Sequence, residues 1–162
     1  MGLTLTRMSE DAVREGTDTV LRRFEDIESA LLRAAGDDAG GSPAGTYCAL
    51  DEEDRSLRAV LTPALGAEAA ENATSGAQYL GEDGHGTTYG YLDLADVAAT
   101  AEALAAVDFR ALLASTDASV LGFRHGLAHG YLEDLRERAE ALTELFALAA
   151  KEGEYVVKKR EG

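Results

Sequence analysis

Hydrophobic and polar residues alternate with a period of two at the start of the chain. Residues 2–8 place leucines between threonines, which is typical of a short strand with one buried face. Ser9 follows as the expected N-cap of a helix, and Gly16 is the expected end of that helix. The start of the chain therefore predicts a strand followed by one short helix.

A longer apolar stripe with the period of a helix comes next. Val20, Phe24, Ile27 and Leu31 follow one another at steps of four, three and four residues, so they share one helix face. The stretch 36–46 then holds four glycines and a proline, and it predicts a flexible loop.

The middle of the chain predicts one helix and one hairpin. Asp51 is expected to cap a helix, and Pro63 is expected to stop it. Residues 78–80 and 87–92 are rich in tyrosine and threonine and flank a glycine-rich turn, which favours two neighbouring strands. Residues 64–76 are small and polar and show no clear pattern.

The last third of the chain has the clearest helical pattern. Asp93 and Asp108 are each expected to cap a helix, and a long helix is expected over about 127–151. Residues 155–157 predict a final strand before a basic tail.

One apolar stripe of the long helix predicts where the core lies. Leu135, Leu142 and Phe146 are seven and four residues apart, so they return to one helix face and should be buried against a sheet formed by the terminal strands. Strands and helices are mixed without regular βαβ spacing. We therefore expect an α+β fold in a single domain over 1–162, with a small mixed or antiparallel sheet.

Charge narrows the range of functions. The 162 residues include 30 acidic and 15 basic residues, which gives a formal net charge of −15. Binding to nucleic acid or to an anionic membrane surface needs a basic face, so we expect neither partner. The chain opens with no signal-peptide pattern, and no apolar run approaches the roughly 20 residues of a membrane-spanning helix. A cytoplasmic location is therefore expected.

Most of the negative charge lies in the middle of the chain. Residues 37–108 hold fourteen acidic residues against only Arg55 and Arg58, a net charge of −12. One interpretation is an ordinary solvated surface. The other is an acidic face for a basic protein partner, because a patch of one sign raises association rates. The favoured function is a non-catalytic binding or regulatory protein, with no oligomeric state assigned.

A cluster of hydroxyl groups and one imidazole gives an alternative function. His85 lies in the glycine-rich turn, close in sequence to Tyr79, Thr88, Tyr89 and Tyr91. Flexible glycines beside such groups can form a small-ligand site, as in a small-molecule binding protein or a hydrolase. The same residues also suit a tight turn between tyrosine-rich strands.

Metal or thiol chemistry has weaker support. His125 and His129 are one helical turn apart and Glu133 extends the line, so the pair is a weak metal candidate. Gly126 replaces the glutamate of the HExxH zinc motif, and a pair of surface or helix-start histidines is the alternative. Cys48 is the single cysteine, which excludes an internal disulfide. No catalytic motif is found and no cofactor is expected.

Several stretches resemble a known bacterial family. Residues 86–97 followed by 103–108 look like the strand-to-helix passage of the YfbM-like proteins (domain of unknown function 1877), and residues 131–156 are similar to that family's terminal helix and strand. The resemblance implies a small α+β domain with no established activity, so no functional residue follows from it. The family's middle helix usually offers a tryptophan and histidines where this chain has Asp54, Arg55 and Arg58.

Overall fold

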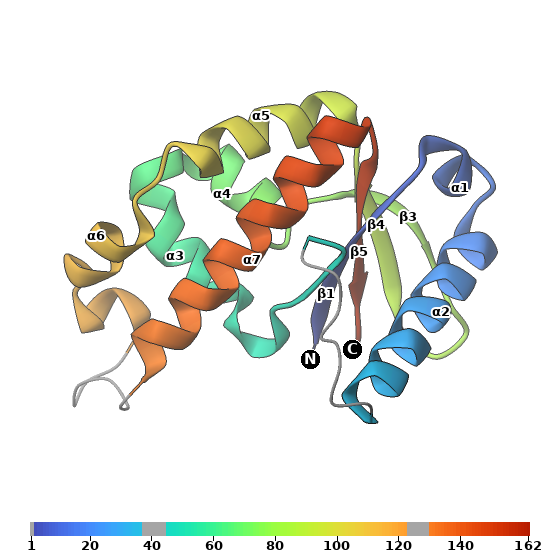
Figure 1. Cartoon of the computed structure of the whole chain (residues 1–162), viewed down its shortest axis with the longest axis horizontal. Coiled ribbons are helices and arrows are strands. Elements are labelled where there is room, and N and C mark those ends of the chain that lie inside the picture. Colours follow the sequence, from blue (N-terminus) through green and yellow to red (C-terminus); the bar gives the residue numbers. More distant parts are fainter. Residues whose placement is uncertain (1, 37–44, 123–129) are drawn as a thin grey trace.

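A computed structural model describes residues 2–36, 45–122 and 130–162, which form one antiparallel sheet with helices on both faces (Figure 1). The expected α+β class is confirmed. The strands are β1 (Leu3–Met8), β2 (Tyr47–Ala49), β3 (Gln78–Glu82), β4 (Thr88–Leu92) and β5 (Tyr155–Arg160). The helices are α1 (Glu10–Arg14), α2 (Thr17–Gly36), α3 (Asp54–Leu65), α4 (Ala67–Ala73), α5 (Leu94–Ala105), α6 (Phe109–Ala114) and α7 (Tyr131–Glu152), with 3₁₀ turns η1 (Asp51–Glu53) and η2 (Ala118–Leu121).

The C-terminal strand lies in the centre of the sheet. The strand order is β2-β1-β5-β4-β3, and every neighbouring pair is antiparallel. Arg160 of β5 pairs with Leu3 of β1 on one side and with Thr88 of β4 on the other. The two ends of the chain consequently lie side by side at one end of the sheet (Figure 1).

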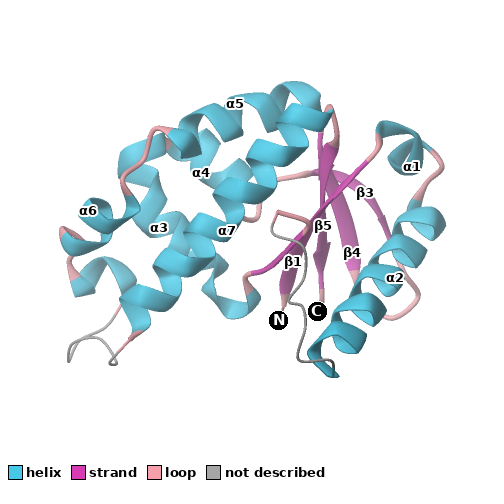
Figure 2. Ribbon diagram, in the orientation of Figure 1, coloured by secondary structure: helices cyan, strands magenta, loops and turns pink. Residues whose placement is uncertain are grey.

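The sheet separates two hydrophobic cores of unequal size. Helices α3 to α7 cover one face, and α1 and α2 cover the other (Figure 2). Because successive side chains of a strand point to opposite faces, Leu5 and Val156 join the larger core, whereas Met8 and Val157 join the smaller one. Each of the two central strands thus contributes to both cores.

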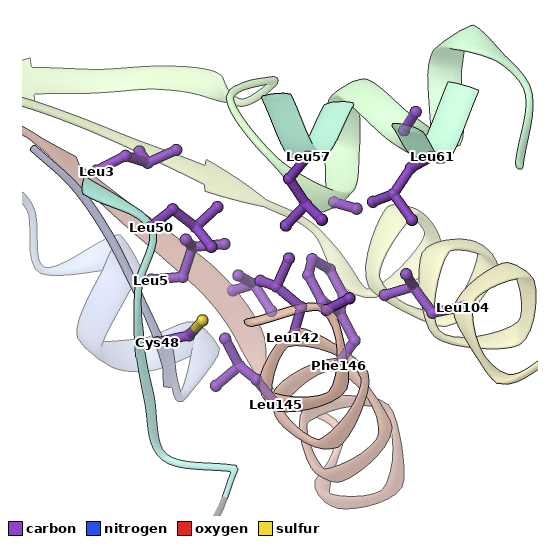
Figure 3. Close-up of a cluster of buried hydrophobic side chains, with 14 of the residues drawn as sticks. Leu3, Leu5, Cys48, Leu50, Leu57, Leu61, Leu104, Leu142, Leu145 and Phe146 are labelled. Atoms are coloured by element: carbon purple, nitrogen blue, oxygen red, sulfur yellow. The ribbon is translucent and has the colours of Figure 1, made fainter. Parts of the chain in front are cut away.

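The larger core confirms the stripe expected on the long helix. Leu135, Leu142 and Phe146 of α7 are fully buried. In Figure 3, Leu142 and Phe146 point toward the leucines of β1 and α3. Helix α7 therefore packs on the sheet formed by the first and last strands, as expected.

The local helix signals are also confirmed. The side chains of three of the four predicted N-caps accept a hydrogen bond from the backbone three residues later. These bonds join Ser9 Oγ to Ala12 N at 3.3 Å, Asp93 Oδ1 to Asp96 N at 3.0 Å, and Asp108 Oδ1 to Ala111 N at 3.1 Å.

Two expectations for the middle helix are wrong. Pro63 lies inside α3 instead of stopping it, and the helix ends only at Gly66, whose φ of 84° an L side chain rarely adopts. Proline has no N–H group, so the carbonyl of Ala59, four residues earlier, loses its usual helical donor, yet α3 continues past Pro63 to Leu65. Asp51 does not cap α3; it opens the 3₁₀ turn with a φ of 47°.

Other boundaries differ because tertiary packing decides them. Helix α7 begins at Tyr131, directly after Gly130 with a φ of 84°. The expected start at residue 127 lies outside the described residues, as does most of the expected loop at 36–46. Strand β5 continues to Arg160 through the basic tail, because β1 and β4 pair with it on both sides. Helix α4 lies within the stretch 64–76, where no pattern was found.

Candidate functional site

The turn between β3 and β4 holds His85 at the surface. The Asp83 carboxylate builds this turn by accepting backbone N–H groups from His85 at 2.8 Å and Thr87 at 3.0 Å. Both bonds favour the charged carboxylate, so they lower the pKa of Asp83. The His85 side chain is exposed and forms no hydrogen bond with another described residue. Its imidazole is presented to solvent.

The pleat of the strands divides the other four candidate residues between the two faces of the sheet. Tyr89 is buried toward α2, where its ring centroid lies 5.9 Å from that of Phe24. Tyr91 shares this face and stacks on Tyr155 of β5, with ring centroids 5.7 Å apart. Tyr79 and Thr88 belong to the opposite face. The five predicted residues therefore do not surround one common space.

Three of the five, Tyr79, Thr88 and Tyr89, nevertheless line one hollow. This hollow has a volume of about 150 Å³, and Ser75, Lys158 and Arg160 also line it. Sequence analysis missed these three residues, because they come from the end of α4 and from the expected basic tail. In an antiparallel sheet, Lys158 and Arg160 are two residues apart on one strand and so share a face.

Lys158 is fully buried beneath the end of α4. Its Nζ donates to the carbonyl oxygens of Thr74 and Gly76, both at 2.6 Å, and to that of Asn72. Burial, and then the neighbouring charge of Arg160, lower the pKa of Lys158. The carbonyl oxygens act in the opposite sense, because three acceptors need three N–H donors, which only the ammonium form has. Lys158 thus satisfies the carbonyls that the end of a helix leaves unpaired.

Two larger hollows have mixed charge. One of about 600 Å³ lies between α2 and the end of β1, and one of about 300 Å³ lies beside the edge strand β2. Charged residues of both signs line each of them, so neither presents a uniform potential. The charged residues are Arg7, Arg23, Asp26, Glu152 and Glu154 in the first, and Asp134, Glu137 and Arg138 in the second.

Only some of the residues considered for metal or thiol chemistry lie within the described part of the chain. His125 and His129 lie outside the described residues. Glu133, which extended their line, forms an ion pair with Arg136. The described part of the chain contains no group of three side chains arranged to hold a metal ion. Cys48 is buried, and burial raises the pKa of its thiol to about 12, so little nucleophilic thiolate exists at neutral pH.

Asp96 at the start of α5 is close enough to Asp93 and to Glu68 of α4 to be repelled by both, and Glu71 is three residues after Glu68 on the same helix. We call Glu68, Glu71, Asp93 and Asp96 the acidic cluster. Within the described residues, none of the four forms an ion pair with a lysine or arginine. Partial burial, and then the negative charges of Asp93 and Glu68, raise the pKa of Asp96. Asp93 and Glu68 therefore repel Asp96, whereas the charge of Glu71 acts to raise the pKa of Lys158.

Many of the basic residues are, by contrast, neutralised within the molecule. The pairs are spread over both faces of the sheet and over α7. They join Arg7 to Glu154 at 2.7 Å, Arg136 to Glu140 at 2.6 Å, Lys159 to Glu28 at 2.8 Å and to Glu161 at 2.9 Å, Arg138 to Asp51 and Arg160 to Asp54 both at 3.6 Å, and Arg14 to Glu10. The negative charge of the acidic cluster is left facing outward.

Comparison with known proteins supports the architecture and assigns no activity. The model of a family described as a domain of unknown function (DUF1877) matches residues 5–158. A similar solved structure is that of a protein of unknown function, YfbM from Escherichia coli, with a TM-score of 0.59 and 15% sequence identity over 98% of this chain and 99% of that one. At this identity the likeness shows the fold alone. No curated protein matches, and no described helix is long and apolar enough to cross a membrane.

Proposed function

Because the chain belongs to the DUF1877 family, to which no function is assigned, we propose a function from its surface: it is a non-catalytic binding protein whose acidic cluster meets a basic protein partner. The observation that carries the proposal is the contrast in pairing described above. None of the four carboxylates of the cluster forms an ion pair among the described residues, whereas six basic residues elsewhere do.

Two physical effects favour a basic partner at this surface. A patch of one sign steers an oppositely charged protein during diffusion and so raises the association rate. A cation placed beside Asp96 also relieves the repulsion from Asp93 and Glu68 that raises the pKa of Asp96. Since Glu68 and Glu71 are exposed and Asp93 and Asp96 are only partly buried, binding should weaken as salt concentration rises.

The proposal is tested with two variants of equal net charge. The first carries Glu68→Gln and Glu71→Gln in the acidic cluster, and the control carries Glu25→Gln and Glu144→Gln on α2 and α7. All four glutamates are exposed on helices, and none forms an ion pair among the described residues. The two variants therefore differ in where charge is lost and not in how much is lost.

Each protein is immobilised at low salt, basic partners are captured from a lysate of the source cells, and the affinity for the identified partner is measured against salt concentration. We expect a basic protein that binds the wild type and the control equally and the cluster variant about tenfold more weakly. Equal affinity for both variants, or no basic partner at low salt, contradicts the proposal.

We further propose a bacterial, cytoplasmic setting. The likeness to YfbM of Escherichia coli supports a bacterial origin. The single buried thiol of Cys48 suits a reducing compartment, where disulfides are rare. Cell fractionation with an antibody against the protein tests the location; recovery in the periplasmic or membrane fraction contradicts it.

A further inference from the structure

The hollow beside Arg160 differs from the rest of this acidic protein. Its floor is the face of β4 and β5 that also bears the larger core, and the segment from Ser75 to Ala77 after α4 forms its wall. Gly90 marks how closely this wall approaches the floor, because a Cβ there would lie 2.7 Å from the Ala77 Cβ. The hollow is thus a defined space at the end of the sheet where the two chain termini meet.

The lining of this hollow contains two basic residues and no acidic residue. Lys158 and Arg160 line it, whereas carboxylates line both larger hollows. Arg58 of α3 adds a third positive charge at the rim, where it donates to Ser75 Oγ at 3.0 Å. Two carboxylates lie close by: Asp54 contacts Arg160 at 3.6 Å, longer than a strong ion pair, and the charge of Glu71 acts to raise the pKa of Lys158. The chain has a net charge of −15, so this concentration of cations locally reverses the sign of the charge.

Several hydrogen-bond donors at the hollow have no acceptor. The Arg160 guanidinium has five N–H groups and forms no hydrogen bond with a described residue. Thr88 Oγ1 likewise has no partner there. Ser75 Oγ accepts from Arg58, so its own hydrogen remains free to donate. The three residues offer donors to one ligand, and no acidic residue is among the residues that line the hollow.

The volume limits the size of the ligand. A space of about 150 Å³ corresponds to roughly five water molecules, at about 30 Å³ each. A tetrahedral oxyanion such as phosphate or sulfate has five non-hydrogen atoms and suits it, whereas a whole nucleotide does not. An arginine beside two hydroxyl donors is also a common arrangement for binding oxyanions.

We propose that the hollow lined by Arg160, Thr88 and Ser75 is a binding site for a tetrahedral oxyanion, either a free ion or the terminal group of a phosphomonoester. Arg160 provides paired N–H donors, and the two hydroxyl groups orient the remaining oxygens. The buried ammonium of Lys158 stays bound to its carbonyls and contributes positive potential beneath the site. Glu71 of the acidic cluster lies against the wall of this hollow at Gly76, but the site does not depend on the proposed protein partner.

Binding is measured by calorimetry and by amide chemical shifts during titration with inorganic phosphate, sulfate and glycerol 3-phosphate. Sodium chloride at the same ionic strength is the reference, because any salt screens the self-repulsion of an acidic protein. We expect saturable phosphate binding, with shifts at the amides of Ser75, Gly76, Thr88 and Arg160. Tighter binding of glycerol 3-phosphate identifies an ester as the ligand, and equal or weaker binding identifies the free ion.

Two variants and one control separate this site from general salt effects. Arg160→Gln should weaken phosphate binding at least about tenfold, and Thr88→Val about threefold, in line with lost charged and neutral hydrogen bonds. Arg33→Gln removes an exposed arginine from α2, on the other side of the sheet, and should bind like the wild type. Circular dichroism in chloride confirms that each variant is folded. The proposal is overturned if the wild type binds phosphate no more strongly than chloride. It is also overturned if Arg160→Gln and Thr88→Val both bind phosphate as the wild type does.

Discussion

Replacing Lys158 with methionine tests how the end of α4 is held on the sheet. Methionine has nearly the length of lysine and suits a buried position, but it cannot donate a hydrogen bond. The carbonyl oxygens of Asn72, Thr74 and Gly76 would therefore lose the shared donor that now binds all three. These carbonyls belong to the backbone, so the substitution cannot remove them along with the ammonium.

The expected cost follows from opposing contributions. A buried acceptor left without a donor costs about 1–3 kcal/mol, which for three carbonyls would sum to several kcal/mol. Two effects reduce this sum: the segment after α4 is only half-buried at Ser75 and Gly76, so water can reach part of it, and the penalty for burying an ammonium disappears. We expect a net loss of about 2–4 kcal/mol from a total stability of about 5–15 kcal/mol.

Lys159→Met provides a matched control on the same strand. Lys159 points to the opposite face, where its Nζ pairs with the partly exposed Glu28 and Glu161, so its loss should cost at most about 1 kcal/mol. Urea unfolding gives both free energies, and amide hydrogen exchange shows whether α4 and β3 open first in Lys158→Met. A Lys158→Met variant as stable as the wild type, or a larger loss in Lys159→Met, would refute this account of the buried lysine.

Three further predictions concern the core. Phe146→Ala should cost about 3–5 kcal/mol in urea unfolding, because the fully buried ring leaves a cavity; a loss below about 1 kcal/mol would contradict the packing of α7. Thr100→Val should stabilise the protein by about 1 kcal/mol, since the buried Thr100 hydroxyl has no hydrogen-bond partner among the described residues; a lower melting temperature would mean that the hydroxyl is satisfied. Burial keeps the Cys48 thiol protonated to about pH 12, while the unfolded thiol ionises near pH 8.5. Wild-type stability should therefore fall by about 1 kcal/mol relative to Cys48→Ala between pH 8 and 9.5, and parallel pH profiles would contradict this.

Signals that act within a few residues could be predicted from the sequence. Ser9, Asp93 and Asp108 cap helices as expected, because a side-chain oxygen and the backbone amide it binds are only three residues apart. The apolar stripe of α7 is also a property of one element. The local rule failed at Pro63, because a proline disfavours but does not forbid a helix, and α3 continues past it to Leu65.

Pairing between distant segments determines where the basic end of the chain and the hairpin residues lie, which local patterns could not predict. The three basic residues at the end of β5 suggested a solvated tail, yet they pair with β1 and β4 in the middle of the sheet. The candidate ligand residues of the hairpin were grouped because they are close in sequence. The pleat then placed Tyr89 on one face and Thr88 on the other, since neighbours along a strand point in opposite directions.

The same pairing explains how a strongly acidic chain can contain a cationic hollow. Net charge is a sum over the chain, whereas the potential at a site depends on the charges within about 10 Å of it at ordinary salt concentrations. The alternation of β5 sends Lys158 and Arg160 to one face and Lys159 to the other, where Glu28 and Glu161 neutralise it. Carboxylates do not line the hollow, and its cations are only partly compensated by Asp54 and Glu71. Two sites on one small domain can therefore select opposite ligands, and each proposal has its own variants and controls.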